Sequence, residues 1–285
     1  MKISVSSYSF AQYINKGTLT QFEVIGKAKE LGFDAVEFTD LTPPEGVSEE
    51  AFAVQIREEC ARQGLFVSAY TVGADFLKGD KKEEAERLKR KVDVAKLLGA
   101  PLMRHDASYT TPKTPNGLEN VLGDLACAIR EVAEYAEKQG VKTMVENHGF
   151  FLQDADRVEK LINAVAHPNF GWLCDMGNFL CADEKPEISC GKAAPYVFYV
   201  HVKDFIVKDG NSADPGEGFF QSRAGNYLRG TIVGHGCVPV LQCLKVLKKS
   251  GYDGCVSLEF EGMEDCMSAL KIGLNNVRKY LSLTE

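Results

Sequence analysis

One local pattern recurs along the chain, in which an amphipathic stretch ends at a glycine and an apolar stretch follows at once. It is found in KELGFDAVEF, ARQGLFVSAY, KLLGAPLMRH, EKQGVKTMVEN and KKSGYDGCVSLEF. A glycine just past a helix often adopts the left-handed conformation, in which a Cβ is disfavoured. The glycines expected to do so are Gly32, Gly64, Gly99, Gly140 and Gly251. The pattern therefore predicts helices that alternate with strands.

The remaining elements can be predicted from periodicity. Apolar residues between 118 and 136 follow the three-four spacing of one helix face, as in Leu118, Val121, Leu122 and Leu125. Thr20 and Glu23 have the spacing of a capping box at the start of another helix. The predicted strands cover residues 2–6, 34–38, 65–70, 101–105, 142–146, 170–175, 197–202 and 254–259.

Eight strands that alternate with about eight helices favour one closed parallel (β/α)8 barrel, a TIM barrel of the α/β class. The composition fits one large core, because 45% of the 285 residues are hydrophobic and 26% are charged. No linker or compositional break divides the chain. We therefore expect a single domain over residues 1–285, with a long loop at about 203–236 that could cover a site.

Charge and cysteine usage narrow the possible partners. The net charge is −7, and basic residues alternate with acidic ones, as in KKEEAERLKRK at 81–91, so binding to nucleic acid or to a membrane surface is disfavoured. No segment approaches the roughly 20 apolar residues of a membrane span, and no signal-peptide core is present. The nine cysteines include no CxxC pair and are predicted to be buried thiols, which indicates a cytoplasmic protein.

Four residues of metal-ligand type each follow an apolar stretch in the second half of the chain. They are Glu146 in TMVENHG, Asp175 in WLCDMGN, His201 in YVHVKD and Glu259 in VSLEFEG. The first two gaps, 29 and 26 residues, match one βαβ step of about 30. The last gap is 58 residues because it contains the predicted loop. Active sites of barrels lie at the C-terminal ends of the strands, so these side chains should converge.

Three carboxylates and one imidazole are a suitable ligand set for one divalent cation. The oxygen-rich set favours Mn²⁺ or Mg²⁺, with Co²⁺ or Zn²⁺ as alternatives. Each residue alone could be a buried polar group that stabilises the end of a strand. Together, unpaired buried charges of like sign would be destabilising, and a cation removes that cost.

The motifs around these residues resemble the xylose-isomerase-like barrels, specifically the sugar phosphate isomerase/epimerase group. That group includes ketose 3-epimerases, hydroxypyruvate isomerase and inosose dehydratase. The resemblance covers nearly the whole chain and is most specific in VENHG at 145–149, DMGN at 175–178, HVKD at 201–204 and GYDGCVSLEFEG at 251–262.

The resemblance implies roles for individual residues. Glu146, Asp175, His201 and Glu259 match the metal ligands of the family, and Glu146 and Glu259 also match its catalytic pair. Many members have a histidine where this chain has Asn178, so one substrate contact that is common in the family is not assigned in this chain. Glu261 has the same strand parity as Glu259 and is the alternative ligand.

These features predict a metal-dependent isomerase or epimerase of a sugar or sugar phosphate. The cation would stabilise an enediolate while the two glutamates act as proton acceptor and donor. Dehydration of a keto-sugar or inosose on the same site is the alternative. Less favoured are an AP-endonuclease-like nuclease, which needs more histidines than the five present, and a non-catalytic sugar-binding barrel. Such barrels are commonly homo-oligomers, but no stripe in this sequence identifies an interface.

Further residues are candidates for substrate binding. His148 and Lys203 share strand parity with Glu146 and His201, so both can face the pocket. Three other residues lie at strand ends, namely Glu37, Arg104 and His105. Each could form either a substrate contact or a structural salt bridge at the barrel mouth. Arg223 in the predicted loop could close over a hydroxyl or phosphate.

Overall fold

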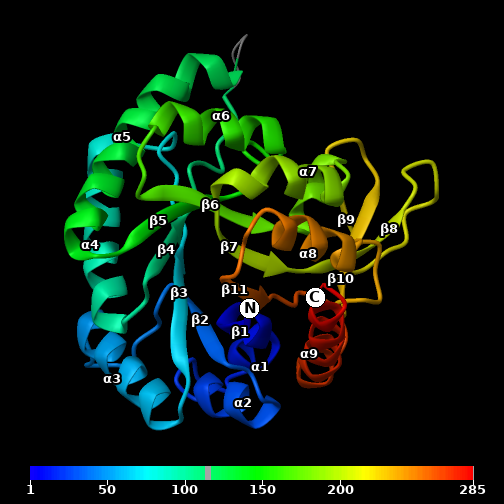
Figure 1. The fold of residues 1–285 in the computed structure, drawn as a ribbon, viewed down its shortest axis with the longest axis horizontal. Helices are drawn as coiled ribbons and strands as arrows, with labels where there is room; N and C mark the ends of the chain where they lie inside the picture. Colours follow the sequence, from blue (N-terminus) through cyan, green and yellow to red (C-terminus); the bar gives the residue numbers. More distant parts are fainter. Residues whose placement is uncertain (113–116, 285) are drawn as a thin grey trace.

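A computed structural model describes residues 1–112 and 117–284 of the chain and contains a closed barrel of parallel strands (Figure 1). All eight predicted strands are confirmed, each within two residues of its expected bounds. In order around the barrel they are β1 (Lys2–Ser6), β2 (Ala35–Thr39), β3 (Phe66–Val72), β4 (Leu102–His105), β5 (Lys142–Glu146), β6 (Phe170–Asp175), β7 (Val197–Val202) and β11 (Cys255–Leu258). β11 pairs with both β7 and β1, which closes the barrel.

Helices surround the barrel, as a TIM barrel requires (Figure 1). The α-helices are α1 (Ala11–Asn15), α2 (Val24–Leu31), α3 (Glu49–Arg62), α4 (Lys81–Leu98), α5 (Gly117–Gln139), α6 (Ala155–Val165), α7 (Pro186–Ala193), α8 (Val240–Lys249) and α9 (Cys266–Ser282). The short 3₁₀ helices are η1 (Ser7–Phe10), η2 (Asn178–Ala182) and η3 (Ala194–Tyr196).

The local signals of the sequence have the expected geometry. All five junction glycines have positive φ, for example 92° at Gly32 and 94° at Gly251. The capping box is also present, because the backbone N–H of Thr20 donates to Glu23 Oε2 at 2.8 Å and that of Glu23 donates to Thr20 Oγ1 at 3.2 Å. Local backbone chemistry therefore sets several helix boundaries in this chain.

The apolar core of the described residues has one large cluster and two small ones, the smallest of which consists of Cys181, Phe205 and Leu228. The large cluster lies between strands and helices and contains most of the buried apolar residues. A second cluster consists of Ala69, Met144, Leu173 and Tyr199, which come from β3, β5, β6 and β7. Because side chains alternate across a strand, this cluster fixes which residues further along the same strands point inward.

The segment expected as a long loop at 203–236 is instead partly folded, so that prediction is wrong in detail. It contains β8 (Asp204–Lys208), β9 (Phe220–Gln221) and β10 (Tyr227–Thr231), which form an antiparallel sheet that stands out beside the barrel (Figure 1). The Asp204 carboxylate accepts hydrogen bonds from the backbone N–H groups of Gly234, Gly236 and Val238. The Asp204 carboxylate therefore fixes the end of this segment, near residues 234–238, to the start of β8.

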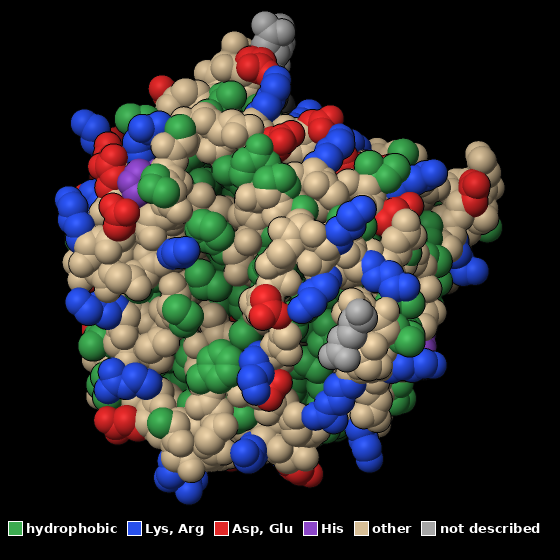
Figure 2. All heavy atoms as spheres, viewed as in Figure 1, with side chains coloured by type: hydrophobic (Ala, Val, Ile, Leu, Met, Phe, Trp, Pro, Cys, Tyr) green, Lys and Arg blue, Asp and Glu red, His purple; other side chains and the backbone are tan. Residues whose placement is uncertain are grey.

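The surface is mixed in charge, and Figure 2 shows Lys and Arg side chains spread over one face with acidic side chains among them. Within the described residues, no helix has the length and apolar character needed to span a membrane. All nine cysteines are free thiols. The expectation that they are buried is wrong for Cys127 and Cys237, which are exposed, and for Cys255, which is partly exposed.

Candidate metal centre

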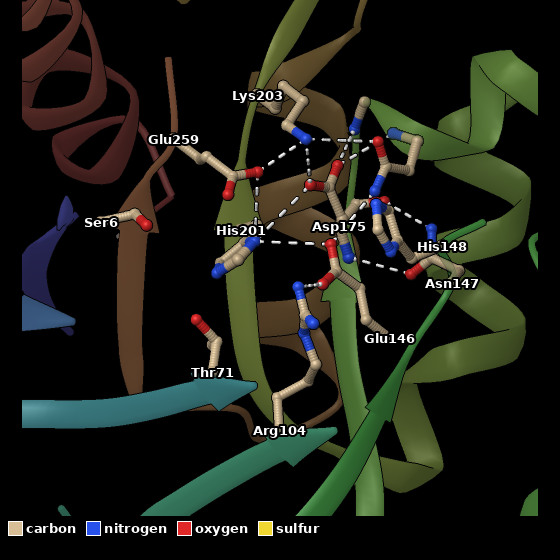
Figure 3. Close-up of polar contacts among 12 residues, drawn as sticks. Ser6, Thr71, Arg104, Glu146, Asn147, His148, Asp175, His201, Lys203 and Glu259 are labelled. Atoms are coloured by element: carbon tan, nitrogen blue, oxygen red, sulfur yellow. Dashed lines mark hydrogen bonds and ion pairs between the residues drawn. The ribbon is translucent and has the colours of Figure 1, made fainter. Parts of the chain in front are cut away.

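Glu146, Asp175, His201 and Glu259 converge inside the C-terminal end of the barrel (Figure 3). Each offers one ligand atom, and these four atoms all lie within 4.8 Å of one another. All four residues are buried. We call this set the carboxylate–histidine centre.

Strand alternation explains the convergence. Met144, Leu173 and Tyr199 of the inner cluster lie two residues before Glu146, Asp175 and His201 on the same strands. Residues two apart on a strand share a face, so the polar side chains stand directly above the apolar cluster. β6 and β7 are paired so that Asp175 lies opposite His201. Glu259 follows β11, which lies on the other side of β7.

The imidazole of His201 lies in the middle of the centre. Its Nδ1 is 3.6 Å from Glu146 Oε1, 3.6 Å from Asp175 Oδ2 and 3.5 Å from Glu259 Oε2. Its Nε2 lies 2.8 Å from Glu37 Oε2, a buried carboxylate from β2. A carboxylate on the far nitrogen fixes the tautomer and orientation of a ligating histidine, so Nδ1 is left to face a cation.

The two oxygens of Asp175 have different surroundings. Oδ1 accepts hydrogen bonds from the backbone N–H groups of Gly177 and Asn178, both at 2.8 Å. Oδ2 is buried and accepts no hydrogen bond. The side chain of Asn147 also brackets the backbone of Asp175, since Nδ2 donates to its carbonyl and Oδ1 accepts from its N–H. The carboxylate is thus fixed by one oxygen and presents the other to the centre.

Glu146 is paired with a cation from the neighbouring strand β4. Arg104 Nη2 lies 2.6 Å from Glu146 Oε2, and Arg104 Nη1 lies 2.8 Å from Asp106 Oδ2. Asn178 Nδ2 donates to the other oxygen, Glu146 Oε1, at 3.1 Å. Burial works to raise the pKa of Glu146, but Arg104 and His201 outweigh it and lower that pKa. The glutamate is therefore ionised at neutral pH.

Glu259 is paired with Lys203, which extends from the end of β7. The Lys203 Nζ lies 2.6 Å from Glu259 Oε2, 3.4 Å from Asp175 Oδ2 and 3.5 Å from Glu261 Oε2. Burial favours a higher pKa for Glu259, yet Lys203 and His201 hold it well below its usual value. The centre therefore contains Glu259, while Glu261 lies on the far side of the lysine.

The residues present fit a divalent cation. Asp175 Oδ2 and His201 Nδ1 are buried polar atoms without a hydrogen-bond partner, and they face the same point. Buried polar atoms are rarely left unpaired unless an ion or water satisfies them. The donor set of three carboxylates and one imidazole adds the negative charge that a divalent ion neutralises.

Two of the other predicted residues lie near the centre in different roles. His148 is at the mouth, where its Nδ1 lies 2.8 Å from Asp106 Oδ1 and its side chain is one-third exposed. Glu37 was predicted as a possible substrate contact, but it is fully buried against His201. The substrate contact of His148 stays a prediction, whereas Glu37 contacts His201 and fixes its orientation.

The structure places His105 away from the centre, so the prediction of a substrate contact for it is wrong, whereas Arg223 lies at the rim and its substrate contact stays a prediction. His105 is on the outer face of β4, packed between the rings of Phe76 and Phe170. Its neighbour Arg104 takes the inward position because adjacent strand residues face opposite sides. Arg223 pairs with Asp154 and donates to the carbonyl of Phe150, which ties the small sheet to the loop after β5.

Asn147 and Asp106 were not identified in the sequence. Asn147 follows Glu146 in VENHG, and its side chain forms hydrogen bonds with the backbone of Asp175 in β6, 28 residues away. Asp106 follows directly after β4 and contacts both Arg104 and His148. A signal was available for Asp106, because it is a further carboxylate just past a strand end.

Comparison with known proteins identifies the fold family. A family model described as "Xylose isomerase-like TIM barrel" matches residues 25–280. None of the curated proteins matches the chain significantly.

Solved structures with the same fold have low sequence identity to this chain. A probable 3-DHS dehydratase from Bacillus anthracis is 18% identical, with a TM-score of 0.73 over 98% of this chain and 99% of the other. D-allulose 3-epimerase from Methylomonas sp. is 15% identical, with a TM-score of 0.72 and 98% of both chains covered. A xylose isomerase-like TIM barrel protein from Mycobacterium smegmatis, in complex with magnesium, is 18% identical, with a TM-score of 0.73 over 99% and 97% of the two chains.

Proposed function

The chain belongs to the xylose isomerase-like TIM barrel family, and on that premise we propose that it is a metal-dependent sugar isomerase or epimerase. The observation that carries the proposal is the convergence of Glu146, Asp175 and Glu259 around Nδ1 of His201. Glu37 on the opposite nitrogen adds support, because it prepares His201 to be a ligand rather than a structural residue.

The four residues of the carboxylate–histidine centre would hold the cation. Mn²⁺ or Mg²⁺ suits this oxygen-rich set best, with Co²⁺ or Zn²⁺ as alternatives. When bound, such an ion acts as a Lewis acid that stabilises negative charge developing on a substrate oxygen. The magnesium-containing structure with the same fold is consistent with this choice.

The two glutamates differ in the cation that accompanies each of them. Arg104 beside Glu146 cannot release its proton in the working pH range, so it only keeps the carboxylate ionised and ready to accept one. Lys203 beside Glu259 carries an ammonium, so this pair holds a proton that can be delivered to the substrate. We assign Glu146 as the proton acceptor and the Lys203–Glu259 pair as the donor, with the transferred proton on the Lys203 ammonium because Glu259 is ionised. A proton delivered to the opposite face of the same carbon inverts that carbon, and a proton delivered to the next carbon isomerises the sugar.

Dehydration is the second candidate reaction. The Lys203 ammonium 2.6 Å from Glu259 Oε2 can supply a proton to a departing hydroxyl group. One protein of the same fold is a probable 3-DHS dehydratase. The nuclease alternative has less support, since His201 is the single histidine among the described residues of the centre.

Solvent deuterium separates these reactions. The metal-loaded protein is incubated in deuterium oxide with a panel of ketoses, aldoses and keto-polyols, and C–H signals are followed by NMR. We expect deuterium at one carbon next to the carbonyl, with a new epimer or isomer. A dehydratase would instead release water and form an unsaturated carbonyl product. Neither exchange nor dehydration across the panel, with the metal bound, would contradict the proposal.

Glu37→Gln should weaken metal binding while the fold is retained. The amide keeps the shape of the side chain but loses the charge that orients and polarises His201. Loss of such an outer partner typically costs about 10- to 100-fold in metal affinity. Competition with a chelator of known affinity measures this change. An unchanged affinity would show that Glu37 does not act through His201.

A further inference from the structure

A small cavity lies next to the centre, at the mouth where the chain closes the barrel. Its volume is about 190 Å³, and it lies between the segment after β1 and the segment after β11. Tyr8, Asn15 and Glu261 are among its polar lining residues, and Phe260 adds an apolar surface. None of its described lining residues is Lys, Arg or His.

Lys203 connects this cavity to the carboxylate–histidine centre. Its ammonium lies 2.6 Å from Glu259 Oε2 on one side and 3.5 Å from Glu261 Oε2 on the other. The Glu261 side chain is about one-quarter exposed, so its carboxylate is accessible from the cavity. The ion pairs of Lys203 therefore join Glu261, which lines the cavity, to Glu259 of the centre.

The cations that contact the centre are already neutralised. Arg104 pairs with Glu146 and Asp106, and Lys203 lies within 3.5 Å of three carboxylates. At the rim, Arg223 pairs with Asp154. Phosphate recognition relies on Arg or Lys groups that are free to donate to the phosphate oxygens. Among the described residues that line the cavity there is no such group.

We propose that this cavity binds the end of the substrate remote from the reacting carbons, and that this end is hydroxylated and uncharged. The Glu261 carboxylate accepts hydrogen bonds from sugar hydroxyls, and the Tyr8 hydroxyl and Asn15 amide supply further polar contacts. A terminal phosphate would face Glu261, and like charges in close contact exclude the wrong ligand. The inference rests on the proposed function for the reaction, and it specifies free sugars rather than sugar phosphates.

Binding, measured separately from turnover, tests the inference. Saturation-transfer NMR with the Mg²⁺-loaded protein gives dissociation constants for D-fructose, D-ribulose and D-xylulose and for the terminal monophosphate of each. We expect at least one free sugar to bind at least about tenfold more tightly than its phosphate, since like-charge contact is costly. Glu261→Gln should bring the two constants closer together, mainly through tighter binding of the phosphate. Tyr8→Phe should weaken binding of the free sugar.

Asp253→Asn is the matched control, because it removes one acidic charge at the opposite end of the barrel, before β11. It should leave the preference unchanged. Tighter binding of the phosphates, equal binding of both forms, or no binding of any free sugar would overturn the inference. Deuterium exchange that occurs only with phosphates would uphold the proposed reaction and reject the inference. Preferential binding of a free sugar without deuterium exchange would uphold the inference and reject the proposed reaction.

Discussion

Glu259→Gln and Glu146→Gln should each lower the rate of solvent-deuterium exchange into the substrate by about 10²- to 10⁴-fold, the range for loss of a general acid or base. The amide keeps the size of the side chain and one oxygen that can face the cation, but it cannot accept a proton. The double variant should be little worse than the poorer single variant, because groups that act as a unit are not additive.

The exchange rate is measured by NMR at saturating metal, so that weakened metal binding is separated from lost proton transfer. Glu264→Gln is a suitable control, since this glutamate follows β11 on the same segment but contacts Thr231 and Arg229 outside the centre. It should retain most of the exchange activity. Activity near the wild-type level in both Glu146→Gln and Glu259→Gln would rule out the proposed proton acceptor and donor.

Arg104→Met should strongly destabilise the metal-free protein. Arg104 is the guanidinium between Glu146 and Asp106, both of which are buried. Removing one partner of a buried ion pair leaves an uncompensated charge, at a cost of about 3–5 kcal/mol. A bound divalent cation would offset part of this loss, because it neutralises Glu146. Denaturant unfolding with and without Mg²⁺ measures both effects.

Arg104→Lys and Arg62→Met provide the comparisons. A lysine keeps the charge but cannot bridge two carboxylates in the same forked geometry, so it should lie between wild type and Arg104→Met. Arg62 pairs with Glu59 on the exposed surface of α3, and its loss should change the unfolding midpoint far less. If Arg104→Met has the same free energy of unfolding as wild type in the absence of metal, Arg104 does not stabilise the buried carboxylates of Glu146 and Asp106.

The barrel was predictable from sequence because its signals are local. The junction glycines such as Gly99 and Gly140 take positive φ for steric reasons that involve only their own turns. Glu146 and Asp175 were predictable for a related reason, since each ends an apolar strand and the carboxyl ends of barrel strands share one site.

The errors arose where a contact depends on register or on distant partners. Arg104 and His105 follow two apolar residues in LMRH, so alternation alone does not say which of them points inward. Glu37 meets His201 across 164 residues, next to a shift in the pairing of β2 with β3. The small sheet at β8 to β10 was missed because β9 has only two residues and the segment between β8 and β10 is rich in glycine and polar residues.

The metal content of the purified protein after Mn²⁺ reconstitution, for wild type beside Asp175→Asn, tests the account most directly. Asparagine keeps an oxygen for the N–H groups of Gly177 and Asn178, so the fold should survive, but it replaces Oδ2, the oxygen that faces His201 and Lys203. We predict one ion per wild-type chain and its loss in the folded variant. No ion in wild type, or equal content in the two proteins, would contradict the assignment of the carboxylate–histidine centre as a metal site.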